Sequence, residues 1–349
     1  MKCTIQNIAD HLGLSRNTVS KALKNSSEVS ENTRNLVIKT ASKLGYKNAT
    51  FATPVIPASE TDSNGTILFL TRTYASDSEF WTTVLRGIES ILSNANYHLA
   101  ISIMSDSDLK QLNFPQTISD SSIKGIILVE ICDKVVCDAL SQFNLPIVSV
   151  DMPNVPFEEL NGIDVVTMES KKNLKKIINQ LIEKGAESFG FVGDLYSPNV
   201  SRGFQERYNA LSECLAEHQL PLNQKNCLLH QTPEDFRNFQ TTVNNLQAMI
   251  SLPDVFICGN DWTAIQLIYA LQFLGFQIPK DICVVGFDNI PAASRISPSL
   301  TTISTPQKYL GIAAARQILE RIQHPNCPHV FCQYETELSI RNSTNIISF

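Results

Sequence analysis

The chain of 349 residues contains no apolar run of the roughly 18 residues that a membrane-spanning helix needs. Its first residues, MKCTIQNIADHLG, also lack the apolar segment of a signal peptide, so we expect a cytoplasmic protein with no membrane partner. The nine cysteines include no CxxC pair, and the six histidines are dispersed. Neither a disulfide framework nor a metal site is therefore expected.

The signatures of common catalytic and cofactor sites are missing as well. The chain has no GxGxxG or GxxxxGK[ST] motif for a nucleotide, and no GxSxG nucleophile elbow. We therefore predict a binding protein that has no cofactor and is not an enzyme. The alternative is an enzyme that processes carbohydrates or nucleotides, and turnover assays would distinguish it.

The charge of the chain is unevenly distributed. Residues 1–50 hold eight Lys and Arg against three acids, whereas the whole chain has a net charge of −6. A basic head on an acidic body indicates that the head alone meets a polyanion. A solvated basic surface is the plainer interpretation of the same charges.

Apolar residues at helical spacing predict three short helices within residues 1–47. Gly13 can supply a positive φ in the turn between the first two helices, and Leu14 is expected to pack inward. The expected helix N-caps are Thr4, Ser15 and Ser30, whose side-chain oxygens can accept free backbone N–H groups. These features predict a compact unit of three helices.

Polar side chains of the second helix fall outside its apolar face. Arg16, Asn17 and Lys21 carry the groups that read guanine and adenine edges in the major groove of DNA. Phosphate contacts are expected from further polar residues of the head, namely Thr4, Ser15, Thr18, Ser20, Asn25 and Arg34. An ordinary three-helix cap with polar outer residues is the alternative.

The stretch TIQNIADHLGLSRNTVSKALKNSSEVSENTRNLVIKTASKLGY resembles the N-terminal helix-turn-helix of the bacterial lactose/galactose repressor (LacI/GalR) family. The resemblance implies that the second helix is a recognition helix and that Arg16, Asn17 and Lys21 contact bases. Residues 48–65, NATFATPVIPASETDSNG, are expected to be a linker. In that family this segment forms a hinge helix, but Pro54 and Pro57 would interrupt one here, so we expect a degenerate hinge or a tether.

The body, residues 66–349, alternates short apolar runs with stretches of helical length. The runs are TILFLT, HLAISIM, GIILVE, PIVSVD, DVVTM, SFGFVGD, DVFICGND and DICVVGFD. Runs this apolar are typical of parallel strands that are buried on both faces. The pattern predicts two doubly wound α/β lobes with a cleft between them, and ligands bind beyond the carboxyl ends of such strands.

Polar and aromatic residues follow several of these runs and are candidates for ligand contact. They are Phe80, Trp81, Arg207, Asn260, Asp261, Trp262 and Asp288. Carboxylate, amide and guanidinium groups can hold sugar hydroxyls, and an aromatic face packs on a sugar or a flat ring. Each candidate also has a structural interpretation: the Asn-Asp pair as helix N-caps, Asp288 in a turn, Arg207 in a surface ion pair, and the aromatic pair as core.

The family resemblance continues over the body, most clearly in DVFICGNDWTAIQLIYALQFLGFQIPKDICVVGFDNIPAASRISPSLTTISTP. It implies a periplasmic-binding-protein-like body in which Arg207, Asn260 and Asp288 contact the effector. The implied lobes are residues 66–168 with 303–327, and residues 169–302 with 328–349. The segment 307–322 resembles the helix that returns to the first lobe, and residues 335–344 resemble the final strand.

We therefore expect a ligand-responsive repressor of sugar-uptake or catabolic genes. Only five residues follow the final strand, so we expect no tetramerising helix and a homodimer that binds a pseudo-palindromic operator in double-stranded DNA. The effector is expected to be a sugar or a sugar derivative. The alternatives are a purine-like effector, or a non-catalytic sugar-binding protein of the periplasmic type.

Overall fold

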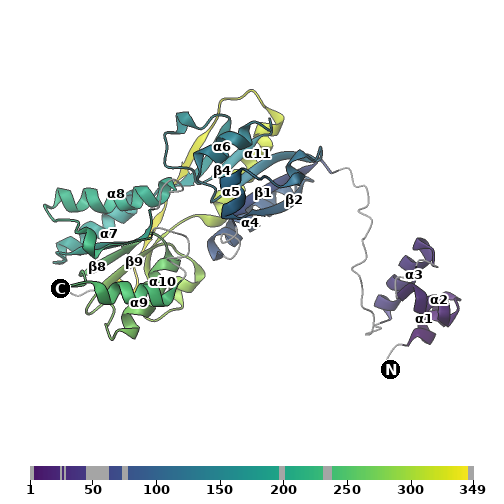
Figure 1. Cartoon of the computed structure of the whole chain (residues 1–349), viewed down its shortest axis with the longest axis horizontal. Helices are drawn as coiled ribbons and strands as arrows, with labels where there is room; N and C mark the ends of the chain where they lie inside the picture. The colour runs from purple at the N-terminus through teal and green to yellow at the C-terminus, as the bar shows by residue number, and fades with distance from the viewer. Residues whose placement is uncertain are drawn as a thin grey trace. The chain divides into compact units, whose positions relative to one another are not determined.

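The computed structural model describes residues 4–23, 26, 29–44, 63–72, 78–195, 201–230 and 238–344 (Figure 1). The chain divides into two compact units, residues 1–62 and residues 63–349. Most of the predicted linker, residues 48–62 of 48–65, lies outside the described residues.

The first unit is the predicted helix-turn-helix head. Its helices are α1 (Ile5–Leu12), α2 (Arg16–Leu23) and α3 (Glu31–Lys43). The three predicted N-caps are confirmed, because Thr4, Ser15 and Ser30 each accept a backbone N–H from the residue three positions later. Gly13 has the expected positive φ of 65°. The helices enclose a small apolar core of Ile8, Ala9, Val19, Ala22, Val29, Val37 and Ala41.

The first lobe of the body is built on a six-stranded sheet in the order β11-β5-β4-β3-β1-β2, and all its strands are parallel. The strands are β1 (Thr66–Arg72), β2 (His98–Met104), β3 (Ile123–Val129), β4 (Ile147–Val150), β5 (Ile163–Met168) and β11 (Phe331–Tyr334). The helices of this lobe are α4 (Glu79–Leu92), α5 (Asp106–Gln111), α6 (Lys134–Ser141) and α11 (Gln307–Gln323).

The second lobe has a six-stranded sheet in the order β12-β10-β9-β8-β6-β7. Its strands are β6 (Phe189–Asp194), β7 (Leu228–His230), β8 (Val255–Cys258), β9 (Cys283–Asp288), β10 (Thr301–Ser304) and β12 (Glu337–Ser339). Its helices are α7 (Lys172–Glu183), α8 (Arg202–Glu217), α9 (Phe239–Ala248) and α10 (Asp261–Phe273). All eight predicted strands are present, but β12 runs antiparallel to β10, so this sheet is not wholly parallel.

The chain passes between the two sheets three times, and two of the expected lobe boundaries need correction. Strand β11 pairs with β5 of the first sheet, although residues 328–349 were expected in the second lobe. Strand β10 pairs with β9 of the second sheet, so the second passage follows Ser304 and not residue 302. The error at β11 arises because this short strand pairs with β5, which lies far earlier in the sequence.

Helix α11 is confirmed as the element that returns to the first lobe, where it packs closely against α4. Two glycines permit the close approach. A Cβ on Gly311 would collide with the backbone oxygen of Val84 in α4, and a Cβ on Gly87 would collide with that of Lys308 in α11. The two helices therefore form one tightly packed pair on the first sheet.

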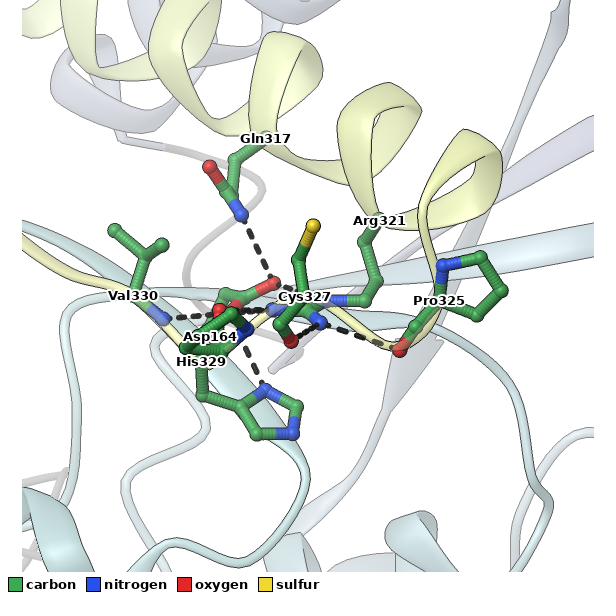
Figure 2. Close-up of polar contacts among 8 residues, drawn as sticks. Asp164, Gln317, Arg321, Pro325, Cys327, His329 and Val330 are labelled. Carbon is green, nitrogen blue, oxygen red and sulfur yellow. Dashed lines mark hydrogen bonds and ion pairs between the residues drawn. The ribbon is translucent and has the colours of Figure 1, made fainter.

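A buried carboxylate fixes the loop that connects α11 to β11 (Figure 2). Asp164 is fully buried and accepts hydrogen bonds from Arg321 Nε at 3.0 Å and Nη2 at 2.8 Å. It also accepts hydrogen bonds from Gln317 Nε2 and from the backbone N–H of Val330, and it lies 3.3 Å from His329 Nδ1. Burial alone would raise the pKa of Asp164, but the Arg321 and Val330 contacts outweigh it and hold the pKa below its ordinary value.

Two further properties bear on function. Within the described part of the chain, no helix is both long and apolar enough to cross a membrane. The described residues also contain no group of three or more His, Cys, Asp or Glu side chains placed to hold a metal ion.

Candidate functional site

The first candidate surface is the outer face of α2 in the head. Arg16 and Asn17 occupy the first two positions of this helix, and both are exposed. Lys21 is half-buried, while Val19 and Ala22 point into the head's core. The helix therefore buries its apolar residues and presents two of the three predicted base-reading side chains fully to solvent at its N-terminal end.

The residues predicted to contact phosphates differ in their burial and in their hydrogen bonds within the head. Thr4 and Ser15 serve as helix N-caps, and Ser15 Oγ lies 2.8 Å from Thr18 Oγ1. Arg34 Nη2 donates to the carbonyl oxygens of Ser26 and Val29 at 2.8 and 3.0 Å, so this side chain holds the turn before α3. Ser20 is half-buried, and Asn25 lies outside the described residues. Phosphate binding by these residues stays a prediction.

The second candidate surface lies at the carboxyl ends of the parallel strands. In the first lobe, Arg72 ends β1, Glu130 follows β3 and Asp151 follows β4. In the second lobe, Asp194 ends β6 and Asp288 ends β9. Because all these strands are parallel within their sheets, the charged residues gather at one edge of each sheet.

The two edges are electrostatically coupled to each other. Asp194 and Asp151 both raise the pKa of Glu130, which reaches about 8 chiefly because burial disfavours the charged carboxylate. Asp288 of the second lobe interacts with Glu130 and Asp151 of the first, and burial raises its pKa well above the ordinary value. The carboxyl ends of the two sheets therefore face each other, and we call Glu130, Asp151, Arg207 and Asp288 the strand-end cluster.

Arg207, on α8, is the cationic member of the strand-end cluster. Its side chain is 4% exposed, and its guanidinium carbon lies 3.6 Å from the ring centroid of Phe287. Nη1 donates to the backbone oxygen of Gly259 at 2.7 Å. Burial lowers the pKa of Arg207, and the negative charges of Asp288 and Asp151 oppose that shift. Arg207 and Asp288, both predicted to contact the effector, therefore lie in one region, and their contact with an effector stays a prediction.

The backbone around Asp288 joins the second lobe to the start of α11. Asp288 has a φ of 116°, and its backbone oxygen accepts hydrogen bonds from Thr305 Oγ1 at 3.1 Å and Gln307 Nε2 at 2.6 Å. Gln307 is the first residue of α11, which packs on α4 in the first lobe. A displacement of the Asp288 backbone would therefore displace the N-terminal end of α11 and with it one end of the α4–α11 pair.

Asn260 and Asp261 have clear structural roles. Asn260 is the N-cap of α10, and its Oδ1 accepts the backbone N–H of Thr263 at 2.9 Å. Asp261 is fully buried, and its oxygens accept hydrogen bonds from Thr302 Oγ1 and the backbone N–H of Ile290. Burial raises the pKa of Asp261 to about 7. Asp261 thus supports the strand ends, which differs from the direct effector contact predicted from the sequence.

The three aromatic candidates, Phe80, Trp81 and Trp262, lie in different surroundings. Phe80 is 5% exposed in the body's main core, which matches its structural interpretation. Trp81 is half-buried, and its side chain hydrogen-bonds to Glu130 of the strand-end cluster. Trp262 is 39% exposed, and helical spacing places it on the same outer face of α10 as Tyr269 and Phe273. Of the three, Trp81 is therefore the one that belongs with the cluster.

Two acidic members of the cluster were missed by the sequence analysis. Glu130 and Asp151 are the final letters of GIILVE and PIVSVD, so each directly follows a predicted buried strand. That is the same signal that identified Asp288. Asp151 is 8% exposed, and its Oδ1 accepts the backbone N–H of Met152 at 2.8 Å.

The loop after β4 contacts the second lobe directly beside the cluster. The backbone N–H of Arg202, at the start of α8, donates to the oxygen of Met152 at 3.0 Å. Pro153 and Ser201 form an isolated β-bridge, and the Arg202 guanidinium lies 5.0 Å from the ring centroid of Phe331 in β11. The helix that carries Arg207 therefore begins at a contact between the lobes.

Comparison with known proteins agrees with this two-part organisation. Residues 4–48 match the model of the bacterial regulatory proteins of the lacI family, and residues 178–344 match the periplasmic binding protein-like domain. The chain is 27% identical over 327 residues to the ribose operon repressor of Haemophilus influenzae, covering 93% of each chain.

Two solved structures share the fold over nearly the whole chain. A complex of the transcriptional regulator CelR with cellobiose has a TM-score of 0.68 at 20% identity and covers 98% of this chain and 100% of its own. The lac repressor dimer bound to operator and an anti-inducer has a TM-score of 0.67 at 19% identity and covers 99% of both chains. The chain therefore belongs to the LacI family of bacterial regulatory proteins, which are non-catalytic DNA-binding repressors with a periplasmic-binding-protein-like effector domain.

Proposed function

We propose that this protein represses sugar-uptake or catabolic genes and that a small molecule bound between its lobes controls its affinity for the operator. The proposed DNA binding rests on the arrangement of α2, which buries Val19 and Ala22 while presenting Arg16 and Asn17 to solvent. In our proposal Arg16, Asn17 and Lys21 contact base edges in the major groove. The polar residues predicted to contact phosphates set the register.

The effector site in this proposal is the strand-end cluster. Carboxyl groups from both lobes and the stacked guanidinium of Arg207 offer acceptors and donors suited to a small polar molecule. A sugar or sugar derivative is the class favoured, and the relatives support it: the Haemophilus influenzae protein is a ribose operon repressor, and the CelR structure holds cellobiose. A purine-like effector is the second candidate, because the half-buried Trp81 ring could stack on a flat ligand.

We further propose that the protein acts as a homodimer through apolar side chains left exposed on the body. On α10, Trp262, Tyr269 and Phe273 are 39%, 45% and 69% exposed and lie on one helix face. In the first lobe, Ile101 and Ile103 are 53% and 48% exposed on the edge strand β2. Large apolar side chains that are exposed side by side typically mark a surface that binds another protein. The lac repressor structure is itself a dimer on its operator.

Ligand control requires that the effector prefers one arrangement of the lobes. The hydrogen bonds from Thr305 and Gln307 to the backbone of Asp288 tie the proposed effector site to α11. Helix α11 in turn packs against α4 in the first lobe. In this proposal, closure of the lobes on a ligand moves the α4–α11 pair and changes the spacing of the two heads in the dimer.

The test is a selection of duplexes from a random library with the full-length protein at a stated salt concentration. The proposal expects an enriched pseudo-palindrome. A fixed central base step would mean that residues 48–65 read the minor groove, whereas a featureless centre would make them a tether. No enrichment at all would overturn the proposed DNA reading and favour the sugar-binding alternative.

A further inference from the structure

The carboxyl group of Glu130, at the edge of the first sheet, has only part of its hydrogen-bonding capacity used by the residues that the structure describes. Glu130 directly follows the central strand β3 and has a φ of 58°. Its Oε2 atom is buried and has no hydrogen-bond partner among the residues that the structure describes. The Trp81 side chain hydrogen-bonds to this carboxyl group and so helps to fix its position. Glu130 therefore holds a buried acceptor that a ligand could use.

The charges that face Glu130 come from four strand ends. Asp194, Asp151 and Asp288 repel its negative charge, and Arg72 attracts it. Arg72 is already engaged by Asp106, with Nη2 and Oδ1 2.6 Å apart. Four carboxyl groups thus share this region with few cations to balance them. Bringing carboxylates together away from water is unfavourable unless positive charge is supplied.

An independent observation on the second lobe also points to a ligand. Arg207 is 4% exposed, and its Nε is a buried donor without a partner among the described residues. Its Nη1 is used by the oxygen of Gly259, which fixes the plane of the guanidinium. An unpaired buried N–H costs about 1–3 kcal/mol unless a ligand oxygen accepts from it. The first lobe thus offers an unused acceptor, and the second offers an unused donor.

We infer that the effector is a small polyhydroxylated amine, such as an amino sugar, whose ammonium group binds Glu130 and whose oxygens accept from Arg207. This inference rests on the proposed function and narrows its ligand class. The ammonium group stabilises the ionised form of Glu130 and so offsets the cost of burying that charge beside the other carboxyl groups. Because burial raises the pKa of Glu130 to about 8, its carboxyl group holds a proton at neutral pH, and formation of the carboxylate–ammonium pair would release that proton to the solvent.

The test is isothermal titration calorimetry of the full-length protein with matched pairs of compounds. The pairs are D-glucosamine with D-glucose, D-galactosamine with D-galactose, and D-mannosamine with D-mannose. We expect at least one amine to bind about tenfold or more tightly than its neutral partner, since a hydrogen bond between charged groups outweighs a neutral one. Titration at pH 7 in Pipes and in Aces, two buffers that differ in their enthalpy of ionisation and are not polyhydroxylated amines, should also reveal release of a proton on amine binding.

Two variants separate the role of Glu130 from a general effect of charge. Glu130→Gln keeps the shape of the side chain and should abolish both the preference for the amine and the proton release. Glu158→Gln removes an exposed carboxylate of the first lobe and should leave both unchanged. Thermal unfolding of each variant shows whether the fold is retained.

The outcomes also distinguish this inference from the proposed function. A neutral sugar that binds as tightly as its amine and changes operator affinity overturns the amine assignment and leaves the proposed function standing. Retention of the preference in Glu130→Gln overturns the assignment as well. Failure of all three amines to bind overturns the inference, and if no compound alters operator affinity the proposed effector control fails with it.

Discussion

Replacing Asp164 with asparagine should destabilise the first lobe strongly, because it removes the negative charge that faces a buried guanidinium. Arg321 is 5% exposed and donates twice to Asp164, at 3.0 and 2.8 Å. Breaking a buried ion pair from one side costs about 3–5 kcal/mol. Arg321 also donates to the backbone oxygens of Pro325, Cys327 and Pro328, so we expect the lower end of this range, about 3 kcal/mol.

Urea unfolding followed by tryptophan fluorescence measures this effect. The chain has two tryptophans, so a Trp262→Phe background leaves Trp81 as a reporter of the first lobe. With a denaturant slope of about 3 kcal/mol per molar, the midpoint should fall by about 1 M. The control is Asp138→Asn, which removes the acid of the surface pair with Lys134 and should cost at most about 1 kcal/mol.

The same ion pair predicts the pH dependence of stability. The pKa of Asp164 is lower in the folded protein than its ordinary value of 3.8, so its contribution is fully present above that value. The contribution should be lost as the pH falls through the lowered pKa, and Asp164→Asn should not show this loss. If Asp164→Asn unfolds within about 1 kcal/mol of the parent chain, the reasoning on the buried pair is wrong.

Three further predictions concern DNA, effector and assembly. Arg16→Ala and Lys21→Ala should each reduce discrimination between the selected duplex and a scrambled one by about 1–3 kcal/mol, measured by fluorescence anisotropy at fixed salt; unchanged discrimination would remove these residues from the recognition surface. Asp288→Asn should abolish the effector's influence on operator binding while the affinity without effector is retained, because the substitution lies in the body and not in the head; a fully responsive variant would place the effector elsewhere. Phe273→Glu puts a charge on the exposed face of α10 and should weaken the dimer at least about tenfold in analytical ultracentrifugation; an unchanged dimer would exclude this face from the interface.

Most of the fold could be predicted because its signals are local. Buried parallel strands appear as apolar runs, and helix N-caps appear as Thr4, Ser15 and Ser30 ahead of helical periodicity. The short strands β7, β10 and β11 were not identified, because LLH, TTIS and FCQY are too short or too polar to stand out. The position of β11 depends on pairing with β5, which lies far earlier in the chain, and periodicity carries no such information.

The candidate site was predicted only in part, because Asp288 was identified at a strand end whereas Glu130 and Asp151 were overlooked at equivalent positions. Asp288 and Arg207 come together because one ends a strand and the other lies on a helix beside it. Asp261 and Trp262 are neighbours in sequence, yet one is fully buried and the other is exposed on the outside of α10. Successive helix positions differ by about 100° around the axis, so adjacency to Asn260 did not decide which side chain faces the other lobe.

The most direct test of ligand-controlled repression is the affinity of the full-length protein for its selected duplex, measured with and without a saturating effector at one salt concentration. The account predicts that the dissociation constant changes about fivefold or more, as expected for a coupling free energy of at least about 1 kcal/mol. A ligand that binds between the lobes, as shown by loss of its binding in Asp288→Asn, but leaves the affinity for DNA unchanged would contradict the account.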